Sequence, residues 1–175
     1  MILAVLLLLP AEMFWMHLLS GFLVKLFPGG ESYMEFLTRI LIENDRPVWL
    51  LVVAIGIFPG ICEEVLFRGA ILGTLMKNKD YSTLKLCSIV GIMFGIMHMS
   101  VVRFLPTTIL GMLLTWLAIR TRSIFPSILL HVLNNTMAII LVLNKVEVVS
   151  WGGFIASCLG IIGFWLIIKK TGSGS

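Results

Sequence analysis

The chain has 175 residues, of which 59% are hydrophobic and 13% are charged, and its formal net charge is +4. Its mean hydropathy is +1.06. Soluble domains carry about a quarter charged residues, so this chain has too little polar surface to cover itself in water. The composition predicts an integral membrane protein in contact with the lipid bilayer. It contains no long basic run, so nucleic acid is not expected as a partner.

Six apolar stretches reach or approach the roughly 20 residues that a helix needs to cross the hydrocarbon core. In chain order they cover Ile2–Phe27, Pro47–Met76, Thr83–Val101, Phe104–Ile119, Ile124–Leu143 and Val149–Ile168. The expected fold class is all-α, a polytopic transmembrane helix bundle of about six spans. We expect residues 1–171 to form a single integral-membrane domain, and the tail 172–175 resembles a leftover linker.

The segment between the first two stretches has its own pattern. Its apolar residues recur at helical spacing, and its polar residues fall between them: Tyr33, Phe36, Leu37, Ile40 and Leu41 against Glu31, Glu35, Arg39 and Glu43. This pattern predicts an amphipathic helix in the membrane interface. A soluble cap is the alternative interpretation.

Loop cations predict the orientation of the bundle. With six spans, one side carries Lys77, Lys79, Lys85, Arg120, Arg122, Lys169 and Lys170, and the other carries Lys25, Arg39, Arg46, Arg103 and Lys145. The excess on the first side predicts that both termini are cytoplasmic. Glycines four residues apart (Gly56/Gly60, Gly69/Gly73 and Gly91/Gly95) predict that the second and third spans pack closely against neighbours.

Ionisable side chains inside spans are costly and are therefore functional candidates. The second span contains Glu63, Glu64 and Arg68, the third His98, and the fifth His131 with Asn135 one turn later. Glu12 and His17 in the first span are isolated by comparison.

Glu64 and Arg68 are four residues apart, so one helix can hold them as an ion pair, and that pair can be purely structural. Glu63 points about 100° away around the same helix and has no partner there, so it can serve as a general base or simply bind a neighbouring helix. Each histidine, taken alone, can likewise be a packing residue. The set on three spans predicts one hydrolytic cluster.

The three motifs Glu63-Glu64-x-x-Phe67-Arg68-Gly69, Phe94-x-x-x-His98 and His131-x-x-x-Asn135, in that order, resemble the signature of the CaaX-protease and bacteriocin-processing (CPBP, Abi-type) family. The resemblance covers a motif core of about residues 60–135. It implies an intramembrane endopeptidase that cleaves a membrane-associated peptide or protein, in a bacterial plasma membrane. Family members often have about eight spans, so a partner subunit that supplies further helices stays open.

The resemblance also implies roles for the six residues. Glu63 activates a water molecule, His98 orients or deprotonates it, and His131 with Asn135 stabilises the oxyanion. Glu64 and Arg68 hold the geometry of the second span or grip a substrate carboxylate. No cofactor is favoured. The runner-up is a divalent metal such as zinc held by Glu63, His98 and His131, although the spacing of common zinc proteases is absent.

Two other classes of function stay open. One is a non-catalytic membrane scaffold or bacteriocin self-immunity factor, and the other is an ion or proton transporter. The predicted depths are also in tension. His98 falls near one membrane face and His131 falls ~12 Å from the other, so a shared site requires tilted or broken helices and a water-filled cavity.

Overall fold

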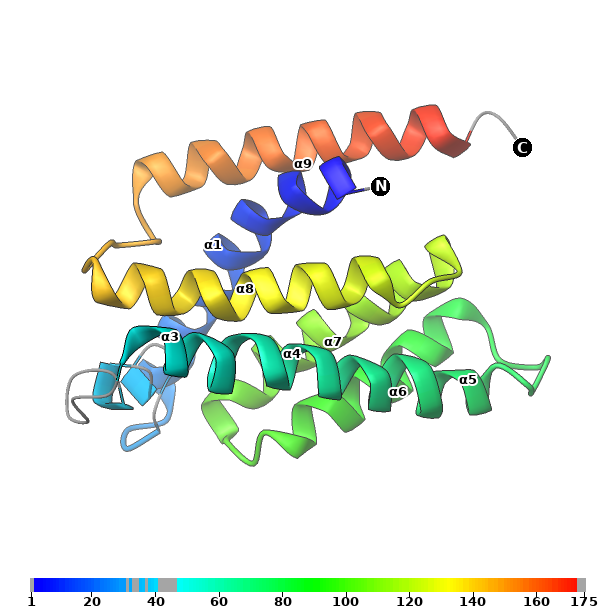
Figure 1. Cartoon of the computed structure of the whole chain (residues 1–175), viewed down its shortest axis with the longest axis horizontal. Helices are drawn as coiled ribbons and strands as arrows, with labels where there is room; N and C mark the ends of the chain where they lie inside the picture. Colours follow the sequence, from blue (N-terminus) through cyan, green and yellow to red (C-terminus); the bar gives the residue numbers. More distant parts are fainter. Residues whose placement is uncertain (1, 31, 33–34, 37, 41–46, 173–175) are drawn as a thin grey trace.

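A computed structural model describes residues 2–30, 32, 35–36, 38–40 and 47–172, and the structural statements below refer to these residues (Figure 1). The helices are α1 (Ile2–Leu26), α3 (Val48–Leu51), η1 (Val52–Ile57), α4 (Phe58–Glu64), η2 (Val65–Ile71), α5 (Leu72–Leu75), α6 (Thr83–Met97), α7 (Val101–Thr121), α8 (Phe125–Leu143) and α9 (Trp151–Gly172). None of the described residues forms a strand.

The predicted fold class is confirmed. Five helices are long and apolar enough to cross a membrane: α1, the continuous run Val48–Leu75, α7, α8 and α9. The sixth, α6, is apolar but has only 15 residues. The expected third span therefore ends at Met97 instead of Val101, because the chain turns back at Met99, whose φ is 44°.

The second span is one 28-residue helix that contains two π-helical stretches, η1 and η2. π-Helical turns widen a helix and often mark functional sites. Glu63 and Glu64 lie at the end of α4, directly before η2. The widened geometry therefore begins at the two carboxylates.

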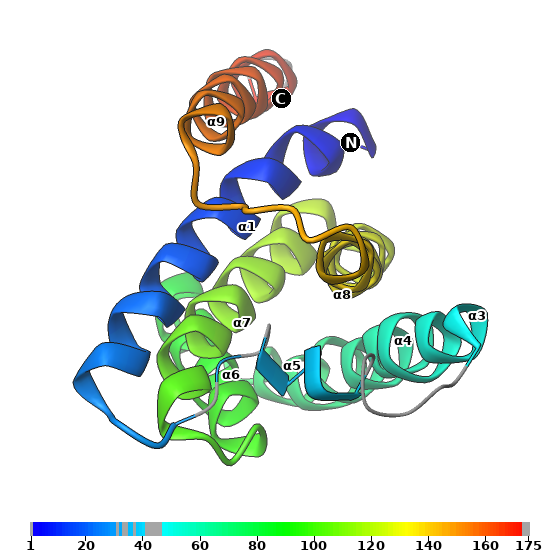
Figure 2. The ribbon, with the colours of Figure 1, turned by 90° about the vertical axis from the view of Figure 1, so that its left-hand side faces the viewer.

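Helix α7 lies at the centre of the bundle, in contact with α1, α6 and α8, while α9 packs along α1 at the periphery. Figures 1 and 2 show α1 passing obliquely across α7 and α8, and the second span lying along α8. Helix α7 thus contacts its two neighbours in sequence, α6 and α8, and also α1 from the start of the chain.

Glycines set the closest approaches between helices. A methyl group added to Gly60 would lie 2.8 Å from Val132 Cγ2, and one added to Gly56 would lie 2.8 Å from Thr136 Oγ1, both on α8. Gly91 and Gly95 meet the backbone of α7 in the same way. The pair Gly69/Gly73 faces open space, so the prediction of close packing was wrong for that pair.

The segment expected to lie in the interface is described only in part. Residues 35–36 and 38–40 are helical. The Ser32 backbone N–H donates to the Glu35 carboxylate at 2.7 Å, and the Glu35 N–H donates to Ser32 Oγ at 3.2 Å, which is a capping box. Residues 31, 33–34, 37 and 41–46 lie outside the described part, and interfacial placement stays a prediction.

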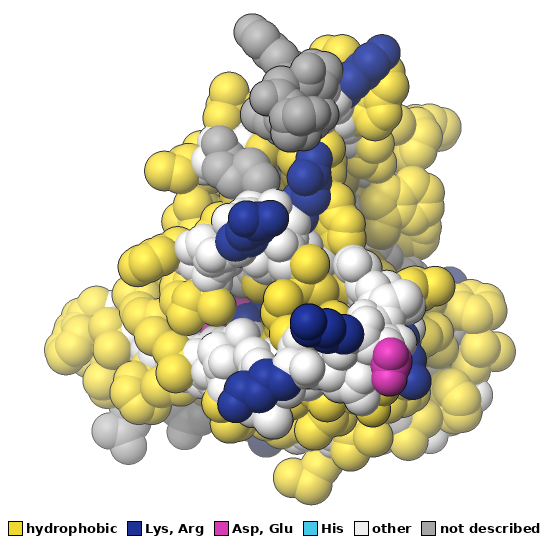
Figure 3. Space-filling view, turned by 90° about the vertical axis from the view of Figure 1, so that its right-hand side faces the viewer, with side chains coloured by type: hydrophobic (Ala, Val, Ile, Leu, Met, Phe, Trp, Pro, Cys, Tyr) yellow, Lys and Arg dark blue, Asp and Glu magenta, His cyan; other side chains and the backbone are white. Residues whose placement is uncertain are grey.

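The two ends of the bundle differ in character. The turns that join α5 to α6 and α7 to α8 lie at the same end as both termini (Figure 1). Figure 3 views this end and shows many Lys and Arg side chains on its surface. The opposite end carries the α6–α7 turn and the connection from α8 to α9.

Candidate active site

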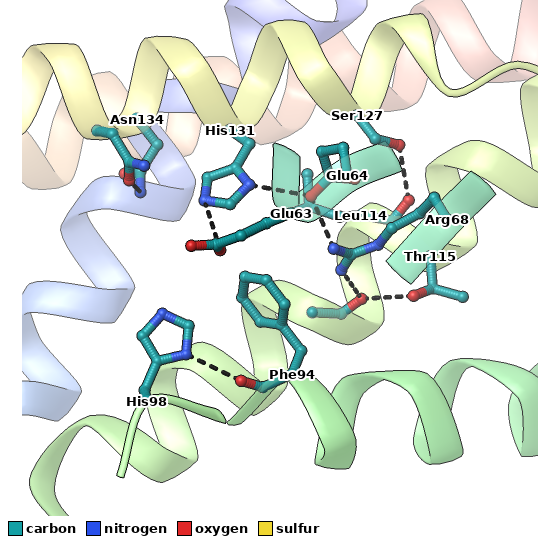
Figure 4. Close-up of polar contacts among 12 residues, drawn as sticks. Glu63, Glu64, Arg68, Phe94, His98, Leu114, Thr115, Ser127, His131 and Asn134 are labelled. Atoms are coloured by element: carbon teal, nitrogen blue, oxygen red, sulfur yellow. Dashed lines mark hydrogen bonds and ion pairs between the residues drawn. The ribbon is translucent and has the colours of Figure 1, made fainter. Parts of the chain in front are cut away.

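The candidate residues predicted from the sequence converge between the second span, α6 and α8 (Figure 4). Glu63 and Glu64 come from α4, Arg68 from η2, His98 caps the C-terminus of α6, and His131 and Asn135 lie one turn apart on α8: together they form the six-residue set expected from the motifs.

The predicted ion pair between Glu64 and Arg68 is present and is buried. Arg68 Nη1 donates to Glu64 Oε1 at 2.7 Å, and both side chains are 0% exposed. Arg68 Nη2 donates to the Gly111 carbonyl at 2.7 Å, so the guanidinium also joins η2 to α7. Among the described residues, Glu64 Oε2 and Arg68 Nε have no hydrogen-bond partner, so the buried pair is satisfied only in part.

His131 is connected to both carboxylates of the second span. Its Nδ1 lies 2.9 Å from Glu64 Oε1 and its Nε2 lies 3.8 Å from Glu63 Oε2. An ionised carboxylate can only accept, so Nδ1 carries the proton and donates it to Glu64. In neutral His131, Nε2 is therefore left with its lone pair toward Glu63. Glu64 fixes both the tautomer and the ring orientation.

Glu63 makes fewer polar contacts than Glu64. Its side chain is 23% exposed, and no described residue forms a hydrogen bond with its Oε2, although that atom is buried. In Figure 4 the carboxylate extends into the space between His131 and His98. A buried carboxylate oxygen without a partner is unusual in proteins and commonly marks a site where water or substrate binds.

His98 faces the same space from α6. Its Nδ1 lies 2.8 Å from the Phe94 carbonyl, which accepts the Nδ1 proton and leaves Nε2 as an acceptor. The Phe94 ring lies between the two histidines, 4.9 Å from the ring of His98 and 5.6 Å from that of His131, and the Arg68 guanidinium lies 4.8 Å from its centroid. The motif Phe94-x-x-x-His98 gives the spacing of Phe94 and no sign of this central position, which depends on tertiary packing.

A cavity of about 510 Å³ is lined by His98, His131, Asn134 and Asn135, whereas Glu63, Glu64 and Arg68 are not among its lining residues. The Asn134 amide donates to Asn135 Oδ1 at 3.5 Å, a long contact that orients the Asn135 amide group. Both His98 and His131 line this cavity, although the sequence places them at different depths in the membrane. The short α6 brings His98 to the same space as His131, although the two residues were expected near different faces.

The cavity also includes residues that the sequence had set apart. Glu12 and His17 of α1 line it together with His131, so they are not isolated from the cluster. Glu12 and His17 reach the cavity because α1 crosses α7 and α8. The spacing of residues within α1 does not indicate this crossing. Within the described part of the chain, no group of three His, Cys, Asp or Glu side chains is arranged to hold a metal ion.

Comparisons with known proteins match the part of the chain that contains these residues. The family model described as "Type II CAAX prenyl endopeptidase Rce1-like" matches residues 45–137, which include the six-residue set. A Bacillus subtilis (strain 168) protein named "Putative membrane peptidase YdiL" is 28% identical over 140 residues, which cover 74% of this chain. The chain spans 57% of the length of that relative. No solved structure matches the chain. Because the family match covers more than half of its residues, the chain belongs to the Rce1-like family of type II CAAX prenyl endopeptidases.

Proposed function

We propose that this chain is an intramembrane endopeptidase that hydrolyses a peptide bond in a membrane-associated peptide or protein with water activated by Glu63. The observation that carries the proposal is the Glu63 carboxylate, whose buried Oε2 has no hydrogen-bond partner among the described residues and lies 3.8 Å from Nε2 of His131. A base next to an oriented histidine that itself lines an open cavity has the parts that hydrolysis requires.

The reaction follows from these positions. Water binds between Glu63 and His98 Nε2, and Glu63 removes one proton while the water oxygen attacks the peptide carbonyl carbon. The carbon–oxygen bond forms and the carbonyl oxygen becomes an oxyanion. Collapse of the intermediate then breaks the carbon–nitrogen bond, and the proton on Glu63 moves to the leaving nitrogen. The products are one carboxylate end and one amine end.

His131 and Asn135 stabilise the oxyanion in this scheme. The Glu64 carboxylate accepts the Nδ1 proton of His131 at 2.9 Å and fixes the ring, so that Nε2, when it carries a proton, can donate to the oxyanion. The Asn135 amide supplies a second donor from one turn along α8, a position that Asn134 supports. Arg68 keeps Glu64 in place and does not touch the substrate.

We propose catalysis without a metal ion, with zinc as the competing possibility. Neutral His98 and His131 each retain one unprotonated ring nitrogen, so their chemistry alone permits metal binding. The water-activating role is assigned to Glu63 because Glu64, the other carboxylate of the pair, already bonds to Arg68 and His131.

For its location, we propose a bacterial plasma membrane with both termini in the cytoplasm. The end of the bundle that carries both termini also carries the described cations Lys77, Lys79, Lys85, Arg120, Arg122 and Lys169. The cavity opens at the other end, where Lys25, Arg103 and Glu147 line it. In this topology the substrate reaches the site from the outer side of the membrane.

Single-cysteine variants test the topology. After replacement of Cys62, Cys87 and Cys158 by alanine, Lys145→Cys should react with an impermeant maleimide in intact cells. Lys79→Cys, at the opposite end, should react only after the cells are permeabilised. The reverse pattern would place the cavity mouth in the cytoplasm and overturn the proposed orientation.

Purified protein in lipid nanodiscs tests the activity. We expect the unmodified chain to cleave members of a fluorescence-quenched peptide library, and Glu63→Gln to reduce kcat by about 10²-fold or more. Asp80→Asn is the matched control, because it removes one carboxylate charge from the exposed turn at the other end of the bundle. Equal cleavage by the Glu63→Gln variant would reject Glu63 as the base, and absence of cleavage by the unmodified chain would leave a non-catalytic scaffold or immunity role as the better explanation.

A further inference from the structure

The wall of the cavity opposite the catalytic cluster is built by α1. The residues that α1 contributes lie on one face of the helix and run from its middle to its C-terminal end: Glu12, Met16, His17, Ser20, Gly21, Val24 and Lys25. This helix lies outside residues 45–137, which match the family. Its polar face is therefore a feature of this chain that the motifs do not account for.

Glu12 is the buried member of that face. It is 6% exposed, and its Oε2 is buried with no hydrogen-bond partner among the described residues. It nevertheless lines the same cavity as His131 and Asn135. An unpartnered carboxylate in an apolar bundle is costly, so a group that enters the cavity and binds it gains more than the same contact gains in water.

The charges around the cavity favour a cation as that group. Near the mouth, the two cations Lys25 and Arg103 are matched in number by the two acids Glu35 and Glu147. Glu12 is an additional acid and, unlike these four side chains, it is buried. A cavity of about 510 Å³ falls within the range of sites that hold a short peptide segment or a compact ligand.

We propose that Glu12 is a specificity-determining residue that binds a basic side chain, lysine or arginine, of a peptide substrate close to the scissile bond. This inference rests on the proposed function, since it places the substrate in the cavity that His98 and His131 line. The ammonium or guanidinium group of the substrate forms a charge-assisted hydrogen bond with the buried carboxylate. Neutral side chains at the same position leave Glu12 without a partner.

A position-scanning library of quenched octapeptides tests this assignment, with lysine or its uncharged analogue norleucine fixed at each position in turn. In nanodiscs, the unmodified chain should cleave lysine peptides with a kcat/KM on the order of tenfold higher than that for norleucine peptides, at one position of the peptide or more. Glu12→Gln should abolish that preference and still cleave the norleucine series, because glutamine keeps the size and polarity of the side chain. Asp80→Asn should retain the preference.

Binding gives a second readout that does not depend on cleavage. The Glu63→Gln variant should bind fluorescent lysine peptides more tightly than norleucine peptides, and Glu63→Gln with Glu12→Gln should bind both equally. Absence of a lysine preference in the unmodified chain, or an equal loss for both series in Glu12→Gln, would overturn the proposal. If Glu63→Gln still cleaves, the catalytic assignment fails, and the binding comparison still decides the role of Glu12.

Discussion

His131 donates from Nδ1 to Glu64 Oε1 at 2.9 Å, and this contact spans 67 residues of sequence. It joins α8 to the second span through a carboxylate that is 0% exposed. The same oxygen accepts a hydrogen bond from Arg68, so Arg68 and His131 both donate to one buried oxygen atom of Glu64. The ring of His131 is therefore oriented by a buried ion pair.

The role of Glu64 as a positioning residue predicts two separable effects. Glu64→Gln should destabilise the protein by about 3–5 kcal/mol, because it leaves the Arg68 guanidinium buried without its counter-charge. It should also lower kcat, with little change in KM, because His131 loses its fixed tautomer. Thermal unfolding in detergent and peptide cleavage measure the two effects.

A double variant separates stability from activity. Glu64→Leu with Arg68→Met replaces the ion pair by apolar side chains of similar size and should recover most of the lost stability. Activity should stay low, since nothing then holds His131 Nδ1. Recovery of both properties would show that the pair serves stability alone.

Asn135 and Asn134 provide a matched pair on α8. Asn135→Ala removes the proposed oxyanion donor and should lower kcat by about 10²–10³-fold with KM nearly unchanged. Asn134→Ala removes only a 3.5 Å contact to Asn135 Oδ1 and should cost much less. Equal losses in steady-state kinetics would argue against a direct role for Asn135.

The glycines of the second span make a test of packing. Gly60→Leu forces a side chain against Val132 of α8 and should lower thermal stability and the yield of folded protein. Gly73→Leu enters open space on the same helix and should be tolerated. Similar unfolding temperatures for the two variants would contradict the close approach of these helices.

Metal analysis tests the proposed metal-free mechanism. Purified active protein should contain far less than one equivalent of zinc, and incubation with a chelator should leave its cleavage rate unchanged. Stoichiometric zinc together with loss of activity on chelation, restored by added zinc, would support the runner-up assignment in which Glu63, His98 and His131 bind the ion.

Local features of the sequence were sufficient to predict the fold class and one contact of the candidate site. The all-α bundle follows from long apolar stretches, and the Glu64–Arg68 pair follows from four-residue spacing within one helix. The early end of α6 did not follow, because Met99 adopts a positive φ without the glycine that usually signals such a turn.

The composition of the cavity could not be predicted for a different reason. Glu12 lies 119 positions before His131, and the two meet in one cavity only because α1 crosses α8. Gly69 and Gly73 have the same spacing as Gly56 and Gly60, yet only the latter pair faces a neighbouring helix. Spacing identifies a face of a helix, and tertiary packing decides what that face meets.

The central claim is that Glu63 makes this chain a protease. The most direct measurement profiles new peptide ends, by mass spectrometry, in membranes of cells that express the unmodified chain, Glu63→Gln or Asp80→Asn at equal abundance. We predict a set of ends that is present with the unmodified chain and with Asp80→Asn and absent with Glu63→Gln, and these ends name the substrate. Identical profiles for all three folded proteins would contradict the claim.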